Sequence, residues 1–354
     1  MERTERLLQK LPENTAALLH NPSNIFYLSG YTGEGLLLVA PGLKAVITDF
    51  RYVEAAQKQC PGFEIHSIRA GIGHVKVAAE LLEKLGVKRL AIEDNIITVR
   101  GMRDMEKVMP ADMSFVPLDF AVEALRTVKD ETELKCIQHA CDITCQAFEY
   151  ICGYIKPGMT ERQVQLALDN KMLELGAQGM AFSTIMASGE NGSLPHAVPG
   201  DRVIQTGDLV TMDYGAKVDG YCSDMTRTVA VGEPSAKLRE IYDIVLHAQE
   251  EAQNALAPGK VCSDMDKVAR DIIAAAGYGE CFGHSLGHGV GIDIHEEPRL
   301  SSRSNDILAP GHVVTVEPGI YVPGLGGVRI ENTCVITENG YRTLCSAPKE
   351  LRIL

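Results

Sequence analysis

The sequence predicts an α+β protein in which an N-terminal α/β domain is followed by a larger domain built from two similar halves. Two observations lead to this prediction. Strand and helix patterns alternate through residues 1–124, which favours a sheet covered by helices. Residues 125–354 contain the order helix, helix, hairpin twice, which predicts a pseudo-symmetric domain. We expect a ligand site between the two halves.

Length and charge narrow the functional classes. A chain of 354 residues is longer than most domains with a single hydrophobic core, so we expect one large domain or two domains. The formal net charge of −13 argues against binding to nucleic acid or to an anionic membrane. No apolar stretch approaches the roughly 18 residues of a membrane helix, and the charged N-terminus lacks the features of a signal peptide.

The cysteines predict a reducing environment. The ten cysteines form no CxxC pair, and Cys141, Cys145 and Cys152 could share one helix face. We interpret them as packed, reduced core thiols rather than as a metal or disulfide site. A cytoplasmic location is therefore expected.

The first 124 residues show buried strands and an amphipathic helix. Residues 35–40 (GLLLVA) and 44–50 (KAVITDF) read as consecutive buried strands. The stretch 74–85 reads as a helix that ends at Gly86, and 89–94 as the next strand. These elements justify an α/β domain.

A long helix opens the second domain. It is expected to begin near Lys129-Asp130 and to end before Pro157-Gly158. No linker marks the boundary, so the change of pattern at residues 122–128 places it, with domains 1–124 and 125–354.

Each half of the second domain has a pair of helices separated by a Pro-Gly stop. The stops at Pro157-Gly158 and Pro258-Gly259 are 101 residues apart. After the first stop, Thr160 and Gln163 form a possible capping box. After the second, we expect Ser263 to be the N-cap.

Each helix pair is followed by a strand that ends in a carboxylate. Residues 207–213 (GDLVTMD) align with 311–317 (GHVVTVE), 104 positions later. A glycine followed by apolar residues and a threonine is common at the start of a strand. The matching order of elements, their spacing and the carboxylate at the same position nevertheless favour an internal duplication.

Hairpin geometry brings four carboxylates to related positions. Asp213 and Asp224 flank the Asp219-Gly220 turn signal, and they lie directly opposite or diagonal depending on the register. Glu317 and Glu331 are centred on Gly324, which brings them to one face.

Inward-facing carboxylates need a compensating charge. Arg227 and Arg329 could neutralise one carboxylate each, or the carboxylates could face solvent. Four carboxylates on otherwise apolar strands instead favour bound cations, and oxygen-rich sites suit hard divalent ions.

Histidines cluster beside the second hairpin. His284, His288 and His295 fall within a glycine-rich stretch, and His196 lies in a turn-rich loop before the first hairpin. The stretch matches neither a phosphate-binding loop nor the HExxH motif, and no GxSxG elbow is present. No cysteine has an obvious activating partner, so covalent catalysis is disfavoured.

Four ordered motifs carry a family resemblance. MDYG…SDMTRT, GHSLGHGVGIDIHEEP, TVEPGIY and GVRIENT resemble those of the pita-bread-fold metallopeptidases, which include methionyl aminopeptidase, aminopeptidase P and prolidase. The front part, with NIFYLSGYTG and ITDFRY, resembles the creatinase-like N-terminal domain of the Xaa-Pro peptidases. The resemblance covers essentially the whole chain.

The resemblance implies a set of metal ligands and catalytic groups. Asp224 and Glu331 would bridge two divalent ions, with Asp213 on one ion and His288 and Glu317 on the other. Manganese is the first choice, and cobalt, zinc and iron are compatible with these ligands. The ligand set is Asp213, Asp224, His288, Glu317 and Glu331.

The implied activity is hydrolysis of the bond between an N-terminal residue and a penultimate proline by a metal-bridged hydroxide. Glu317 is expected to shuttle a proton, and His196 and His295 to stabilise the oxyanion or the departing nitrogen. Arg299 could grip a free C-terminal carboxylate or anchor a surface loop, so dipeptidase and aminopeptidase P activity both remain open.

Two other functions are compatible with the same motifs. A methionyl-aminopeptidase activity is disfavoured by the extra N-terminal domain. A catalytically inactive, protein-binding relative is disfavoured because residues matching all five ligands are present. The resemblance also implies a homodimer in which the N-terminal domain contributes to dimerisation and substrate access. The native metal, the preferred first residue and the peptide length are not determined by the sequence.

Overall fold

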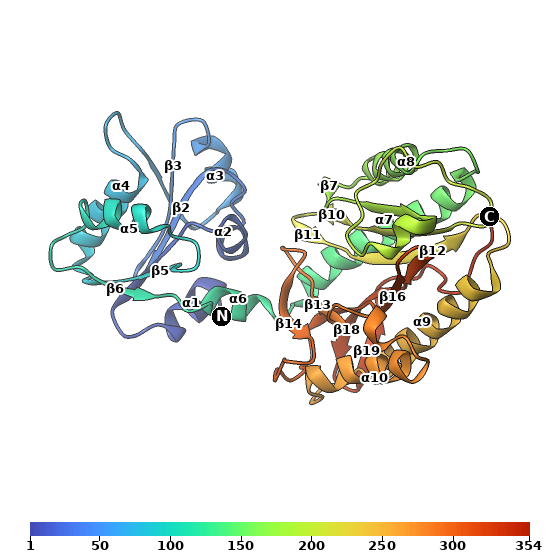
Figure 1. The fold of residues 1–354 in the computed structure, drawn as a ribbon. Helices are drawn as coiled ribbons and strands as arrows, with labels where there is room; N and C mark the ends of the chain where they lie inside the picture. Colours follow the sequence, from blue (N-terminus) through green and yellow to red (C-terminus); the bar gives the residue numbers. More distant parts are fainter. The chain divides into compact units, whose positions relative to one another are not determined.

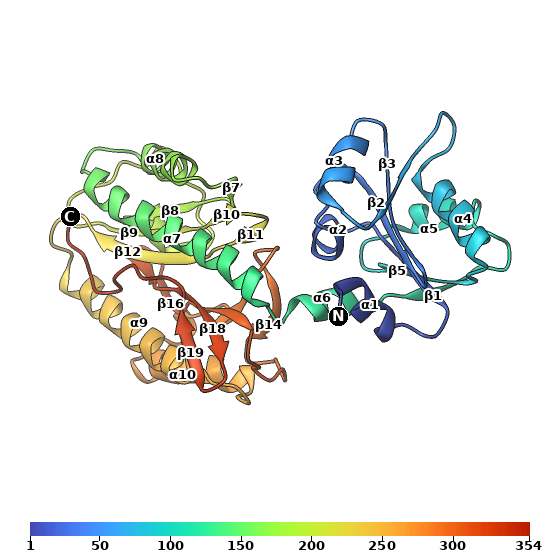
Figure 2. The same ribbon diagram turned by 180° about the vertical axis from the view of Figure 1, so that it is seen from behind.

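The computed structural model describes all residues 1–354, and the chain divides into two compact units, Met1–Arg126 and Thr127–Leu354. Figures 1 and 2 show the two units as ribbons. Each is described by itself below. No helix combines the length and the apolar character that crossing a membrane requires.

Unit 1 is built on a six-stranded sheet of order β4-β3-β2-β1-β5-β6. Its helices pack on both faces, with α4 and α5 on one side and α2 and α3 on the other (Figure 1). The strands are β1 Thr15–Leu19, β2 Gly35–Ala40, β3 Leu43–Thr48, β4 Glu64–Ser67, β5 Arg89–Ile92 and β6 Ser114–Pro117. The helices are α1 Arg3–Lys10, α2 Pro22–Ser29, α3 Val53–Gln59, α4 His74–Leu85, α5 Val99–Glu106 and α6 Ala121–Arg126.

The elements predicted in this unit are confirmed. The two apolar runs form β2 and β3, which pair antiparallel, and the predicted helix is α4. That helix ends at Gly86, whose φ of 66° lies in the left-handed region that favours glycine.

Unit 2 has four long helices outside a group of small sheets (Figures 1 and 2). Helices α7 and α8 cover the strands of the first half, and α9 and α10 cover those of the second. The predicted order of helix, helix and hairpin is therefore found twice, and the α+β fold class is confirmed. The helices are α7 Glu131–Tyr154, α8 Glu161–Glu174, α9 Ala236–Asn254 and α10 Cys262–Ala275, with 3₁₀ turns η1 Gly189–Ser193 and η2 Gly279–Cys281.

The strands of unit 2 form sheets of order β12-β9-β8, β11-β10-β7, β14-β13-β15-β18-β19 and β16-β17. In the first half they are β7 Gly179–Met180, β8 Ile185–Ser188, β9 Leu209–Tyr214, β10 Ala216–Val218, β11 Tyr221–Cys222 and β12 Met225–Ala230. In the second half they are β13 Gly287–Gly289, β14 Glu296–Leu300, β15 Val313–Val316, β16 Gly319–Val322, β17 Gly326–Arg329, β18 Asn332–Thr337 and β19 Gly340–Thr343.

Helix starts follow the sequence signals in two cases of three. Asp130 caps α7, and Thr160 and Gln163 form the predicted capping box of α8. The expected N-cap at Ser263 is wrong, because α10 already begins at Cys262. The amide of Cys262 donates to the carbonyl of Asp306 at 2.9 Å, so a neighbouring loop accepts the hydrogen bond of this helix end.

The register of the first hairpin decides between the two predicted arrangements. Asp219 and Gly220 have φ of 48° and 83° and form the two-residue turn that joins β10 to β11. Asp213 faces Thr226, so Asp224 lies diagonally across the hairpin on the same face. The directly opposite arrangement is excluded.

The second hairpin has the predicted centre. Val322 faces Gly326 across a loop centred on Gly324. The same register continues to Val316, which faces Asn332, so Glu317 and Glu331 lie opposite each other between the two ladders.

The ten cysteines are free thiols. Cys141, Cys145 and Cys152 are buried on α7 as expected. Burial raises the pKa of Cys152 to about 11, so this thiol stays protonated and unreactive at neutral pH.

Candidate metal centre

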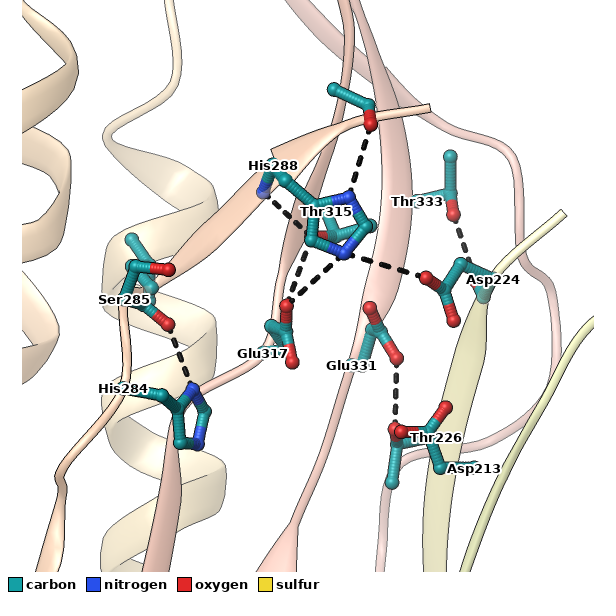
Figure 3. A network of polar contacts seen from close by, with 12 residues as sticks. Asp213, Asp224, Thr226, His284, Ser285, His288, Thr315, Glu317, Glu331 and Thr333 are labelled. Atoms are coloured by element: carbon teal, nitrogen blue, oxygen red, sulfur yellow. Dashed lines mark hydrogen bonds and ion pairs between the residues drawn. The ribbon is translucent and has the colours of Figure 1, made fainter. Parts of the chain in front are cut away.

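Three side chains from separate segments meet in the interior of unit 2. Ligand atoms of Asp224, His288 and Glu331 all lie within 4.8 Å of one another. Figure 3 shows these side chains pointing toward one another, with Glu317 and Asp213 beside them. The exposed fractions of the three are 4%, 7% and 1%.

The strands that carry these residues are fixed by apolar packing. Val316 and Ile330 precede Glu317 and Glu331, and both are fully buried in the core cluster beneath α9 and α10. A strand whose alternate side chains are locked in a core presents its other face without freedom to turn. The carboxylates are therefore held at the centre by their neighbours.

His288 presents one ring nitrogen to the carboxylates. Its Nδ1 lies 3.0 Å from the carbonyl of Gly289, which makes Nδ1 the protonated donor. Its Nε2 lies 3.5 Å from Asp224 Oδ2 and 3.4 Å from Glu317 Oε1. Burial lowers the pKa of His288 to about 4, so the ring is neutral and the Nε2 lone pair is available to a metal ion.

The carboxylates lack the partners that burial normally requires. Asp213 Oδ1, Asp224 Oδ1 and Glu331 Oε1 are buried and accept no hydrogen bond. Burial, and then the charge of Glu331, raises the pKa of Asp224 well above its usual range. Burial, and then Asp213, raises the pKa of Glu331 to about 8.

These observations fit a cation. Oxygen atoms that are buried, unpartnered and mutually repelling cost free energy unless a positive charge compensates them. Several carboxylates with one imidazole are a donor set for divalent ions such as Mn²⁺, Co²⁺, Zn²⁺ or Fe²⁺. The residues present therefore fit the divalent metal that the sequence predicts.

One carboxylate also has an arginine partner. Arg329 Nη2 lies 2.6 Å from Asp213 Oδ2, and both groups are buried. Of the two arginines that the sequence offered as partners, Arg329 therefore pairs with a carboxylate. Arg227 does not, because its guanidinium donates to backbone carbonyls and to Asn332 Oδ1.

A tyrosine that sequence reasoning missed connects this arginine to a histidine. The Tyr321 hydroxyl lies 2.9 Å from Arg329 Nη1 and 2.8 Å from His284 Nε2. His284 Nδ1 also lies 2.8 Å from the carbonyl of Ser285, so both ring nitrogens of this histidine have local hydrogen-bond partners. The sequence feature that could have indicated this role is the position of Tyr321, four residues after the predicted ligand Glu317.

The remaining predicted residues line one cavity with the carboxylates. The cavity holds about 460 Å³, and His196, His295 and Arg299 form part of its wall. The rings of His288 and His295 are 4.4 Å apart between centroids. Arg299 is 55% exposed and lies 3.6 Å from Glu297 Oε1, so it stands at the solvent side.

Comparison with known proteins identifies both units. Residues 135–338 match the model of metallopeptidase family M24, and residues 3–128 match the Creatinase/Prolidase N-terminal domain. The chain is 38% identical over 357 residues to an Xaa-Pro dipeptidase of Pyrococcus furiosus, covering 99% of each. It is 48% identical over 338 residues to an uncharacterized peptidase, YqhT, of Bacillus subtilis, covering 95% of each.

Solved structures agree over the whole length. An Xaa-Pro dipeptidase from Bacillus anthracis superposes with a TM-score of 0.96 at 43% identity, covering 99% of each chain. An X-Pro aminopeptidase from Thermotoga maritima superposes with a TM-score of 0.93 at 36% identity, covering 100% of each chain. The chain belongs to metallopeptidase family M24 and has the Creatinase/Prolidase N-terminal domain.

Proposed function

We propose that this protein is a metal-dependent exopeptidase that hydrolyses the bond between an N-terminal residue and a penultimate proline. One observation carries the proposal: buried carboxylate oxygens without partners surround His288 in a cavity that His196, His295 and Arg299 also line. The full-length similarity to proteins named Xaa-Pro dipeptidase and X-Pro aminopeptidase supports the choice of substrate.

The metal site is assigned to five residues. We assign two divalent ions to this site, with manganese as the physiological metal, and Asp224 and Glu331 would be the ligands common to both. Such ions would supply an activated water nucleophile and polarise the scissile carbonyl. The ligands are Asp213, Asp224, His288, Glu317 and Glu331.

We assign proton transfer, stabilisation of the oxyanion and orientation of a ligand to the side chains around the site. Glu317, whose Oε1 lies 3.4 Å from His288 Nε2, would take a proton from the attacking water and return it to the leaving nitrogen. His196 and His295 line the same cavity and would donate to the developing oxyanion or to the departing amine. Arg329 Nη2 donates to Asp213 Oδ2 at 2.6 Å and would hold this carboxylate in its orientation.

The cavity wall suits proline. Phe182, Ile185 and Ile294 are apolar residues of the cavity lining, and we assign to them the contact with the pyrrolidine ring. A bond to proline is a tertiary amide with no N–H, so a site shaped for the ring need not offer an acceptor there.

A peptide panel tests the proposed function. Ala-Pro, Ala-Pro-Ala, Ala-Ala and Met-Ala are assayed after loading with manganese, cobalt, zinc or iron. We expect turnover of the proline peptides and little of the other two. Preferred hydrolysis of Met-Ala would instead support a methionyl-aminopeptidase activity, and no turnover with any metal would support an inactive relative.

Removal of metal is expected to lower the melting temperature. A metal that binds only the folded state at about 100 times its Kd contributes about 2.7 kcal/mol. For a chain of 354 residues that corresponds to roughly 4 °C, measured by calorimetry with chelator and again after adding manganese. An unchanged melting temperature in both conditions would contradict metal binding at this centre.

Arg299 is expected to distinguish dipeptides from longer peptides. If its guanidinium grips the C-terminal carboxylate of a dipeptide, Arg299→Gln should raise KM for Ala-Pro about tenfold or more. KM for Ala-Pro-Ala should change little, because that carboxylate lies further out. Equal changes in KM for both peptides would assign Arg299 to loop anchoring, through its contact with Glu297.

We propose further that the protein is a cytoplasmic homodimer and that the N-terminal domain, residues 1–124, contributes to dimerisation and substrate access, with residues 125–354 as the catalytic domain. The resemblance to the Xaa-Pro peptidases supports this assignment. Sedimentation equilibrium of the full chain tests the dimer.

A further inference from the structure

We propose that Glu161 is a positioning residue for His196, because it fastens both ends of the loop that carries this histidine. The inference rests on the proposed function for the role of His196. It concerns residues 189–199, which connect β8 to the turn before β9. Glu161 lies outside the cavity, at the first position of α8.

The Glu161 carboxylate is fully buried and accepts hydrogen bonds from both ends of the loop. At the first end, Ser188 donates its amide at 2.7 Å and its hydroxyl at 2.8 Å to Oε1. At the other end, the amide of Gly200 donates to Oε2 at 3.3 Å. The exposed fraction of Glu161 is 0%, so these donors replace the water that the charge has lost.

A third contact reaches into the loop. Asn191 Nδ2 lies 3.1 Å from each carboxylate oxygen of Glu161. From Asn191 a chain of turns leads to the histidine: the amide of Leu194 donates to the carbonyl of Asn191, and the amide of Ala197 donates to the carbonyl of Leu194. His196 lies inside the second of these turns.

The loop also rests closely on the strand that contributes to the metal site. A Cβ added at Gly192 would lie 3.0 Å from the amide nitrogen of Gly327. A Cβ at Gly327 would lie 2.2 Å from the carbonyl oxygen of Gly192. Gly327 is in β17, which ends at Arg329, the partner of Asp213. This close backbone packing leaves the loop little room to shift, and the hydrogen bonds to Glu161 hold it in this position.

This arrangement matters because His196 is exposed at the cavity wall. A surface imidazole that must stabilise a transition state is effective only if its backbone is already in place. Glu161 supplies that placement without touching the substrate.

The test compares Glu161→Gln with the unmodified protein. Glutamine keeps the shape but presents an amide N–H₂ group to donors that need an acceptor. We expect kcat on Ala-Pro to fall between about tenfold and about a hundredfold, with KM and bound metal unchanged. In a His196→Ala background, the same substitution should cost less than about threefold, because the group that it positions is absent.

Hydrogen exchange gives a readout that is independent of activity. In Glu161→Gln, the amides of residues 188–200 should exchange faster, while those of the remaining strands keep their protection. Unchanged exchange would overturn the inference, whatever the activity. Faster exchange in a protein that cleaves no Xaa-Pro peptide would retain the loop assignment and remove the proposed function. An equal loss of kcat with and without His196 would show that Glu161 does not act through this histidine.

Two further variants complete the design. Glu133→Gln is the matched control, since Glu133 is another buried carboxylate in the first turn of a helix, where it accepts from the Tyr221 hydroxyl at 2.9 Å. It should lower stability while kcat stays within about twofold. If Glu161→Gln does not fold, Gly192→Ala moves the same loop from its other side, and it should give the same loss of kcat and the same dependence on His196.

Discussion

Glu331→Ala is expected to lower kcat/KM for Ala-Pro by about a thousandfold or more, because the site loses a charge that no neighbour can replace. Glu331 is 1% exposed, its Oε2 accepts from the Thr226 hydroxyl at 2.8 Å, and its Oε1 accepts nothing. Its ligand atom lies within 4.8 Å of those of Asp224 and His288, and in the proposed site it would be shared by both ions. Bound metal, measured by elemental analysis, should fall together with turnover.

Glu338→Ala provides the control for this substitution. Glu338 is exposed and follows the end of β18, so the same change of side chain occurs a few residues away without touching the centre. It should leave kcat/KM and metal content within about twofold of their original values. A Glu331→Ala protein with full metal content and turnover within about tenfold of the original would show that Glu331 is not a shared ligand.

The same carboxylate should have the opposite effect on the metal-free protein. Without a cation, Glu331 is buried beside other carboxylates, and burial, followed by the charge of Asp213, raises its pKa to about 8. Glu331→Gln removes one of these charges and keeps the volume. The metal-free variant should therefore melt at or above the temperature of the metal-free original, although its activity is lost. The centre thus costs stability until metal binds.

How much of this centre the sequence can predict depends on turn geometry. Gly324 sets a register that places Glu317 opposite Glu331, and both ladders of the second hairpin follow it. In the first hairpin, the Asp219-Gly220 signal allows two neighbouring registers. Only the pairing of Asp213 with Thr226 shows that Asp224 lies on the diagonal. A turn motif predicts which face a carboxylate occupies more reliably than it predicts its cross-strand partner.

Contacts between distant segments cannot be predicted in this way. Ser263 has the residue type of an N-cap, but a carbonyl from residue 306 already accepts at the start of α10. Tyr321 and Arg329 lie on the paired strands β16 and β17, but His284, the other partner of Tyr321, lies in a loop 37 residues away in the sequence. Such hydrogen-bond partners are determined by the tertiary structure and cannot be predicted from local sequence patterns.

Arg227→Met is expected to lower the free energy of unfolding by about 4 kcal/mol, which is among the largest effects a single substitution can have. Arg227 is 1% exposed, and its five N–H groups all have oxygen acceptors. Nε and Nη2 donate to the carbonyls of Pro348 and Ala347 at 2.9 and 2.7 Å, which ties the C-terminal segment to β12. Nη1 donates to the carbonyls of Thr226 and Glu331, and Nη2 also to Asn332 Oδ1.

Methionine has a similar length but no donor, so these carbonyls would remain buried without partners. Arg227→Lys should recover only part of the loss, because an ammonium group cannot reproduce the planar fork. Arg239→Met is the control: Arg239 is 40% exposed and pairs with Glu233 at the surface, so its loss should cost less than about 1 kcal/mol. Urea unfolding with saturating manganese measures all three. If Arg227→Met and Arg239→Met had the same midpoint, the buried guanidinium would contribute no more than a surface ion pair, and the C-terminal segment would have to be held by its other contacts.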